Sequence, residues 1–250
     1  MESKLIIKLD LENEAKRPVP EYLEMKKPPY QTTEMLRYSG VPLDEAKRLV
    51  SGLSVTEEES GLHLEGSIYR ENSSLTPEEE LLLKNLEKAI SLINGKCNFR
   101  AGYVSGKLNR DEDGFPILPF SQKSENLKKN LNHCEGYVMF TATIGAEIDR
   151  LIRRYEISDS AMGMLLQGVG AERAESLCNY FNDEVKRAAA EIGYKAHPRF
   201  SPGYGDLPIT VQKEFLEVLD AGRRLGITLS ESYLMAPSKS VTAVIGLERI

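Results

Sequence analysis

A long helical region is the feature that most constrains the fold of this chain of 250 residues. It runs from Ser158 to Glu191, and in its C-terminal half apolar side chains recur every three or four residues. The recurring positions are Ala174, Leu177, Cys178, Phe181, Val185, Ala188 and Ile192. This spacing predicts an amphipathic helix with one buried face, which Gly193 can end.

Strands and shorter helices surround this region without a repeating strand–helix–strand rhythm. Strands are expected at residues 5–11, 63–69, 101–108, 137–143 and 241–247, and helices at residues 33–49, 76–93, 147–155 and 208–224. Gly40-Val-Pro42 allows two short helices in place of the first one. Thr76-Pro-Glu-Glu79 has the pattern of a capping box with proline at the first helical position.

This order predicts an α+β fold, in which helices pack on a mostly antiparallel, twisted sheet. The prolines at positions 18, 20, 28 and 29 predict an extended arm, and residues 109–119 are rich in loop-forming residues. We therefore expect a small N-terminal part, residues 1–95, and a larger C-terminal part, residues 96–250.

The composition excludes several classes of function. A net charge of −6 argues against general nucleic-acid binding, which needs a basic face. No uncharged apolar run approaches the roughly 18 residues of a membrane span, and no signal peptide is recognisable, so we expect a cytoplasmic protein without membrane association. The three cysteines and three histidines are dispersed, which predicts reduced thiols, no zinc site and no Ser/His/Asp or Cys/His catalytic set.

The segment Arg199-Phe-Ser-Pro-Gly-Tyr-Gly-Asp206 is the strongest candidate for a binding loop. The fork of Arg199 suits a carboxylate, the glycines allow a close approach to the backbone, and the ring of Tyr204 suits a flat group. Together these features could hold a small zwitterion. The same residues also fit an ordinary surface turn with an incidental arginine, because Pro-Gly is a common turn signal.

Two other motifs are weaker. Gly168-Val-Gly170 begins like a dinucleotide-binding motif, but Arg173 replaces its third glycine and helix rather than strand precedes it. We therefore expect these glycines to let another element pack closely on the helix. His63-Leu-Glu-Gly66 is half of a cobalamin-ligand pattern in which Gly61 replaces the aspartate, so a solvent-facing strand histidine is the better interpretation.

Two charged residues remain open to a binding or a structural role. Glu175 borders the apolar stripe of the long helix, where it could bind an ammonium or hydroxyl group or simply be a solvated helix-edge residue. Lys239 could orient an anionic ligand or partner, although a turn lysine explains it equally well.

Three segments taken together resemble the activation (reactivation) domain of cobalamin-dependent methionine synthase. They are Ala171–Phe181, the loop Arg199–Asp206 and Leu229–Thr242, which ends in Pro-Ser-Lys-Ser-Val-Thr. The resemblance covers Tyr137 to Gly246. Free-standing versions of the domain share the motifs R-F-S-P-G-Y-G-D and P-S-K-S-V-T of the last two segments.

The resemblance implies an S-adenosylmethionine site. The family's R-x-x-P-G-Y loop falls on Arg199, Ser201, Gly203 and Tyr204, and its helix glutamate falls on Glu175. Arg199 would then pair with the methionine carboxylate, and backbone near Ser201 and Gly203 would hold the adenine or amino group. Further candidates for the same site are Gly205, Asp206 and Lys239.

The implied function is a reactivation module that acts in trans during the reductive methylation of cob(II)alamin. Its partner would be a corrinoid-binding protein or a methionine synthase that lacks its own activation domain. Cobalamin would come only through that partner, and flavodoxin or another donor would supply the electron. The family's N-terminal ligand aspartate has no evident counterpart, and Gly205-Asp206-Leu207-Pro208 departs from the family's wording after the loop.

Two rival hypotheses stay open. A non-catalytic corrinoid-protein-binding module that has lost the ligand predicts a filled cleft and a large apolar docking surface. A small-molecule methyltransferase unrelated to cobalamin needs a substrate pocket with a general base. The reactivation module predicts instead that Arg199, Tyr204 and Glu175 line one cleft.

Overall fold

The computed structural model describes residues 7–12, 18–50, 53–58, 61–66 and 75–250. The helices are α1 (Thr32–Tyr38), α2 (Leu43–Val50), α3 (Pro77–Ile93), α4 (Glu125–Asn130), α5 (Ala146–Ser158), α6 (Ser160–Glu191), the 3-10 helix η2 (Ile209–Val211), α7 (Gln212–Val218) and α8 (Ala221–Leu225). The strands are β1 (Glu21–Glu24), β2 (Leu53–Glu58), β3 (Gly61–Gly66), β4 (Arg100–Lys107), β5 (Asn109–Arg110), β6 (Pro116–Ile117), β7 (Cys134–Thr143), β8 (Tyr194–Ala196), β9 (Thr228–Leu229), β10 (Met235–Ala236) and β11 (Ser240–Arg249).

The described residues form two compact units, each assembled from separate stretches of the chain. The first unit contains the N-terminal stretch up to Lys26, Phe99–Thr143 and Leu177–Ile250. The second contains Lys27–Asn98 and Ile144–Ser176. Helix α6 therefore contributes one half to each unit. The division at residue 95 expected from the sequence stays a prediction.

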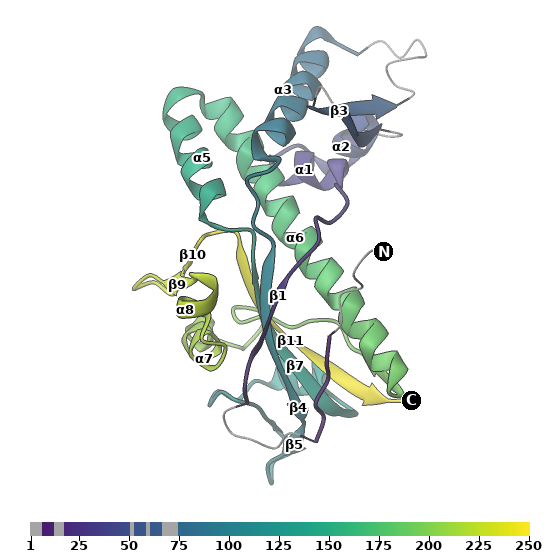
Figure 1. Ribbon diagram of the computed structural model, residues 1–250, viewed down its shortest axis with the longest axis vertical. Coiled ribbons are helices and arrows are strands. Elements are labelled where there is room, and N and C mark those ends of the chain that lie inside the picture. Colours follow the sequence, from purple (N-terminus) through teal and green to yellow (C-terminus); the bar gives the residue numbers. More distant parts are fainter. Residues whose placement is uncertain (1–6, 13–17, 51–52, 59–60, 67–74) are drawn as a thin grey trace. The chain divides into compact units, whose positions relative to one another are not determined.

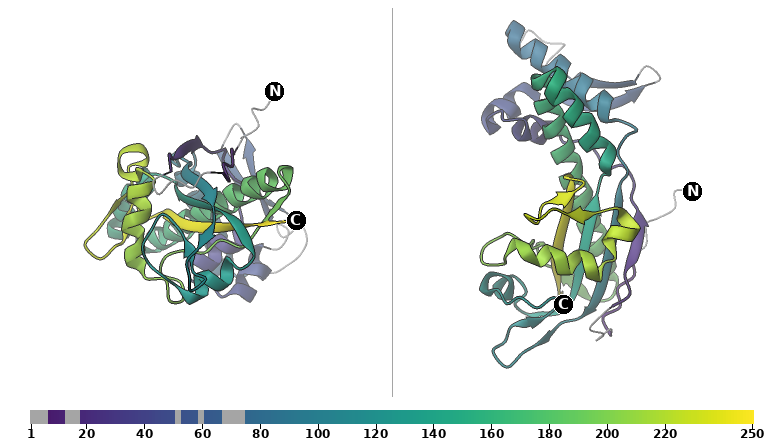
Figure 2. Two further views of the ribbon diagram at one scale, coloured as in Figure 1. Left: turned by 90° about the horizontal axis from the view of Figure 1, so that it is seen from below. Right: turned by 90° about the vertical axis from the view of Figure 1, so that its left-hand side faces the viewer.

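A five-stranded antiparallel sheet is the centre of the first unit. Its strand order is β1-β4-β7-β11-β8, and β1 (purple) lies at its edge in the right-hand view of Figure 2. Both faces of the central strand β7 are buried, which its continuous apolar run Val138-Met-Phe140 requires.

Helices cover the two faces of this sheet, with α7 and α8 on one side and the C-terminal part of α6 on the other (Figure 1). On the first side, Met139 and Val244 share a buried cluster with Phe215 of α7. On the second side, Phe181 of α6 stacks on Phe140, with ring centroids 4.5 Å apart. Alternation of side chains along each strand explains why neighbours such as Met139 and Phe140 enter different layers.

The second unit packs α1 tightly against the N-terminal half of α6 at a glycine. A Cβ atom on Gly168 would lie 2.6 Å from the carbonyl oxygen of Met35 and 2.8 Å from the backbone nitrogen of Ser39. Only a residue without a side chain fits there. The prediction that another element packs closely on the helix at these glycines is confirmed for Gly168.

A buried ion pair fixes the proline-containing arm to the same helix. The side chains of Arg173 and Glu172 are each 1% exposed, and Nη2 of Arg173 lies 2.6 Å from Oε1 of Glu172. Arg173 donates to the carbonyl oxygens of Pro28 and Pro29, and Glu172 accepts from the amide of Gln31 at 3.0 Å. Because partners surround both charges, burial leaves neither of them uncompensated.

Most of the expected elements are confirmed. Two short helices, α1 and α2, replace the single helix at residues 33–49, as Gly40-Val-Pro42 allowed. Thr76 and Glu79 form the predicted capping box at the start of α3. The strands expected at residues 101–108, 137–143 and 241–247 are β4, β7 and β11. Residues 63–66 lie in β3, whereas residues 67–69 fall outside the described residues.

Two expected elements are wrong in part. The strand predicted at residues 5–11 is absent from its described part, residues 7–11, because these amides bond to side chains instead of a neighbouring strand. The amides of Lys8 and Asp10 donate to the hydroxyls of Tyr103 and Ser105. The helix predicted at residues 208–224 is divided into η2, α7 and α8. Asp220 separates α7 from α8, because it adopts a left-handed conformation with φ 43° that a right-handed helix excludes.

We predict that Gly168→Ala destabilises the fold by about 1–3 kcal/mol, the usual cost of overpacking a closely packed site. Urea unfolding followed by far-UV circular dichroism measures the effect. Gly222→Ala on α8 is the matched control, because the nearest atom to its added Cβ lies 3.7 Å away. Equal stability of the two variants would contradict the packing role of Gly168.

Candidate functional site

The loop Arg199–Asp206 begins at the edge of β11. Strand β8 pairs with the end of β11, and the amide of His197 then donates to the carbonyl oxygen of Gly246 at 2.8 Å. Phe200 and Val244 exchange two backbone hydrogen bonds, both 2.8 Å long. Main-chain pairing therefore sets the position of the first residues of the loop.

Alternation along this extended segment separates Phe200 from Arg199. Phe200 packs against the apolar cluster that contains α7 and α8. Arg199 donates from Nη1 to Oδ1 of Asn179 on α6, at 2.7 Å. This contact orients the guanidinium group.

Two glycines with positive φ shape the turn that follows. Gly203 has φ +90° and Gly205 has φ +55°. The amide of Gly203 donates to the carbonyl of Leu207 at 2.8 Å, and the amide of Tyr204 donates to the carbonyl of Ser201 at 3.2 Å. These two amides therefore serve the turn itself. The side chain of Tyr204 in this turn is 68% exposed.

Asp206 joins the end of the loop to the first turn of α4. Its carboxylate accepts hydrogen bonds from the hydroxyl of Ser124 and from the amides of Glu125 and Asn126, at 2.7 and 3.2 Å. The hydrogen bond from Ser124, followed by those from the two amides, lowers the pKa of Asp206 to about 2. A ligand-binding role for Asp206 stays a prediction, but the structure gives this side chain a definite structural role.

Gly205 meets the same helix closely. A Cβ atom at this position would lie 2.5 Å from Nδ2 of Asn126. Together with its φ, this contact explains a glycine between Tyr204 and Asp206 without any ligand.

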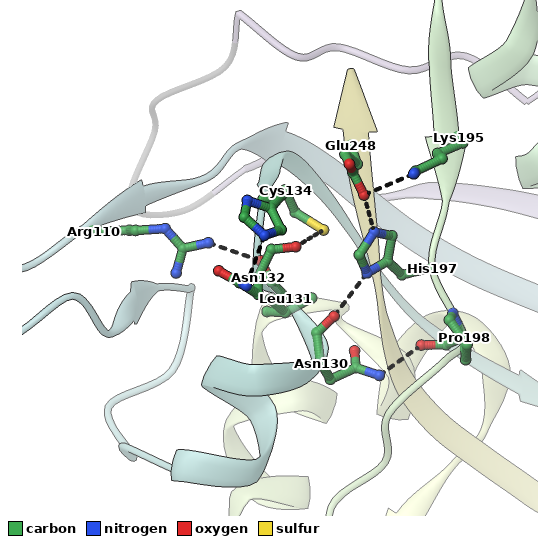
Figure 3. Close-up of polar contacts among 10 residues, drawn as sticks. Arg110, Asn130, Leu131, Asn132, Cys134, Lys195, His197, Pro198 and Glu248 are labelled. Carbon is green, nitrogen blue, oxygen red and sulfur yellow. Dashed lines mark hydrogen bonds and ion pairs between the residues drawn. The ribbon is translucent and has the colours of Figure 1, made fainter. Parts of the chain in front are cut away.

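The other end of α4 holds the start of the loop. The side-chain amide of Asn130 donates to the carbonyl of Pro198 at 3.1 Å, and the backbone carbonyl of Asn130 lies 2.8 Å from Nδ1 of His197. Figure 3 shows these contacts at the end of the helix. Since Asp206 binds the opposite end of α4, this short helix braces both ends of the segment 197–206.

Lys239 and Glu175 are the remaining residues predicted for the site. Lys239 immediately precedes β11, five positions before the Val244 partner of Phe200, which corresponds to roughly 16 Å of extended strand. Glu175 lies in the second unit, where burial and then the charge of Glu175 raise the pKa of the Tyr38 phenol.

Sequence reasoning missed the residues that hold the loop: Asn179, Ser124, Asn130 and His197. Ser124 carried a readable signal, since a serine before a helical stretch is a common N-cap, and it does cap α4 through Leu127. The others act through contacts between residues distant in sequence, which no local pattern reveals.

The three cysteines and His63 make contacts within the fold. Burial raises the pKa of the Cys97 thiol to about 12 and that of Cys134 to about 11, and Cys178 lies in the core as expected. Nδ1 of His63 on β3 lies 3.3 Å from Oε1 of Glu87.

Within the part of the chain that the structure describes, no cluster of His, Cys, Asp and Glu could hold a metal ion. No helix among these residues is long and apolar enough to span a membrane.

A comparison with known protein families matches the part of the chain that contains α4 and the loop Arg199–Asp206. Residues 125–248 match the family model of the activation domain of vitamin B12-dependent methionine synthase. This activation-domain segment begins at the first residue of α4 and ends in β11, so it contains the loop, its brace and the strand to which it is anchored.

The fold agrees with a solved structure over a longer stretch. The crystal structure of a MetH reactivation domain bound to S-adenosylhomocysteine matches with a TM-score of 0.55 and 17% sequence identity. The match covers 95% of this chain and 81% of that one, so it extends well beyond the activation-domain segment. The predicted α+β fold with an antiparallel sheet is thereby confirmed.

We predict that Asp206→Asn lowers the thermal stability at neutral pH. Because folding depresses the pKa of Asp206 from 3.8 to about 2, its stabilising contribution is present above about pH 4 and is lost as the pH falls toward 2. The difference in Tm between the native protein and the variant should therefore shrink between pH 6 and pH 3.

The control for this prediction is Asp183→Asn, which removes an exposed carboxylate that pairs with Lys186 on the surface of α6. Its Tm difference should be small at every pH. A pH-independent difference for Asp206→Asn would show that the charge of Asp206 does not stabilise the fold.

Proposed function

We propose that this protein is an S-adenosylmethionine-binding reactivation module for a cobalamin-dependent methionine synthase or a related corrinoid methyltransferase, acting in trans. The observation that carries the proposal is the braced loop Arg199–Asp206 within the activation-domain segment. It combines an oriented cation with an exposed aromatic ring on a backbone that is held at both ends.

Arg199 supplies recognition of the ligand's carboxylate. A guanidinium group offers five donors in a planar fork, and a bidentate pair with a carboxylate is among the stronger polar contacts in proteins. Because Asn179 already orients the side chain, little additional ordering is needed when the ligand binds.

Tyr204 supplies a flat surface for the adenine. Its ring is exposed at the tip of the turn, next to the backbone of Ser201 and Gly203. Since the amides of Gly203 and Tyr204 serve the turn, the backbone would offer the ligand its carbonyl oxygens, which suit the adenine amino group or the ligand's ammonium group.

The other proposed contacts come from single residues. Glu175 would bind the ammonium group or the ribose hydroxyls, and Lys239 would act on an anionic group of the ligand or partner. Gly205 and Asp206 would contribute through the shape of the loop. S-adenosylmethionine supplies the methyl group on its sulfonium, and the residues of this chain bind and orient it, which requires alignment more than proton transfer.

Cobalamin would be provided by the partner protein, either a corrinoid-binding protein or a methionine synthase without its own activation domain. The electron would come from flavodoxin or another donor. The reported ligand of the structurally similar MetH domain, S-adenosylhomocysteine, is the demethylated form of the proposed ligand and supports this assignment.

We predict that Arg199→Ala weakens binding of S-adenosylmethionine by about 1.5–3 kcal/mol, because a hydrogen-bonded charge pair is lost. Isothermal titration calorimetry of the free protein with S-adenosylmethionine and S-adenosylhomocysteine measures the change. Glu175→Gln in the same series tests the proposed role of Glu175.

Arg223→Ala is the matched control, since Arg223 is an exposed arginine of the first unit that pairs with Asp220. It should bind like the native protein. An Arg199→Ala variant that binds equally well would remove Arg199 from the site. No binding to the native protein, alone or with its corrinoid partner, would favour a docking module that has lost the ligand.

We predict that Tyr204→Ala weakens the same binding by about 1–3 kcal/mol, the usual worth of stacking a base on an aromatic ring. Tyr204→Phe should bind nearly as well as the native protein, because it keeps the ring. Equal losses in both variants would assign the contact to the hydroxyl group instead.

A further inference from the structure

His197 lies between two hydrogen-bond acceptors. Its Nδ1 is 2.8 Å from the backbone carbonyl of Asn130, and its Nε2 is 2.7 Å from Oε2 of Glu248 on β11 (Figure 3). A neutral imidazole has one N–H group and can donate to only one of them, whereas an imidazolium donates to both. Both contacts are therefore hydrogen bonds at the same time only when His197 is an imidazolium, with a proton on each ring nitrogen.

Ionisable groups from several elements lie around this ring. Glu248 faces Nε2, and its pKa is lowered chiefly by His197 and then by Lys195 of β8, which lies 3.2 Å from the same oxygen. Arg110 of β5 binds the carbonyl of Leu131, and the thiol of Cys134 on β7 stays protonated because burial raises its pKa to about 11. His133 contacts Asn132 in the turn before β7.

Histidine is the side chain that ordinarily changes its charge between pH 5 and 8. Glu248 keeps its negative charge across this range because its pKa is lowered. Loss of one proton from the imidazolium of His197 therefore removes one of its two contacts, while Glu248 keeps its charge.

The contact with Asn130 bears directly on the loop. The same asparagine binds Pro198, the residue between His197 and Arg199. Neither His197 nor Asn130 is part of the proposed ligand site, so their effect would pass through the position of Arg199 and the turn after it.

We propose that His197 is a positioning residue whose protonation locks the Arg199–Asp206 loop onto α4, so that ligand binding at this loop is tighter at pH 6 than at pH 8. The part about ligand binding rests on the proposed function. The response of the loop itself does not, and it can be measured in the free protein.

The first experiment is an NMR titration of the free, isotope-labelled protein from pH 5.5 to pH 8.5. We expect the backbone amides of Gly203 and Tyr204 to shift with the same midpoint as the ring of His197. In His197→Gln, which has no charge at any pH in this range, these amide shifts should be lost. Glu248→Gln should move the midpoint of the loop response to lower pH, because the carboxylate no longer favours the imidazolium.

The second experiment measures the Kd for S-adenosylmethionine at pH 6 and pH 8. Binding to the native protein should weaken about three- to tenfold as the pH rises. This change corresponds to part of the net free energy of one hydrogen bond to a charged group. His197→Gln should bind with nearly the same Kd at both pH values. His133→Asn, which tolerates the left-handed φ of 63° at that position, and His63→Gln should keep the dependence of the native protein.

The two experiments separate this inference from the proposed function. Loop amides that do not follow the ring of His197, or that follow pH equally in His197→Gln, overturn the inference even if S-adenosylmethionine binds. Loop amides that do follow the ring in a protein that binds no S-adenosylmethionine support the inference and remove the proposed function.

Discussion

Antiparallel pairing of β11 is the interaction on which the candidate site depends. On one edge β11 pairs with β7 along almost its whole length, and on the other it pairs with β8 and then with Phe200. The strand thus anchors the loop to a sheet that helices cover on both faces. A slip of one residue in this pairing would exchange Phe200 and Arg199 between the two faces, which would expel an aromatic ring from the core.

Helix α4 provides the second constraint, and it acts through charge and hydrogen bonds. Its first amides bind the carboxylate of Asp206, and its last residue binds His197 and Pro198. A mostly exposed loop with two glycines would otherwise have considerable conformational freedom. Bracing both ends lowers the entropy that a ligand must remove, which is the physical basis of preorganised binding.

Close packing at a glycine and a buried ion pair hold the second unit together. Contact of α1 with Gly168 leaves no room for a side chain, and the buried pair of Glu172 and Arg173 holds the arm at residues 28–31. Arg173, which stands where a dinucleotide-binding motif would have a small residue, is here a structural cation lying 3.8 Å from the ring of Tyr30. Gly168 and Arg173 of this motif thus serve packing and polar satisfaction within the unit.

The sequence by itself determined the elements whose signals are local. Apolar periodicity gave α6, continuous apolar runs gave β7 and β11, and the capping box gave the start of α3. The motif at residues 199–206 also located the loop that carries Arg199 and Tyr204. Tertiary structure alone decided that Asp206 and His197 attach this loop to α4, that Asn179 orients Arg199, and that Asp220 interrupts the predicted helix. These outcomes depend on pairings between residues tens of positions apart, or on a backbone angle set by surrounding packing, and neither leaves a periodic trace in the sequence.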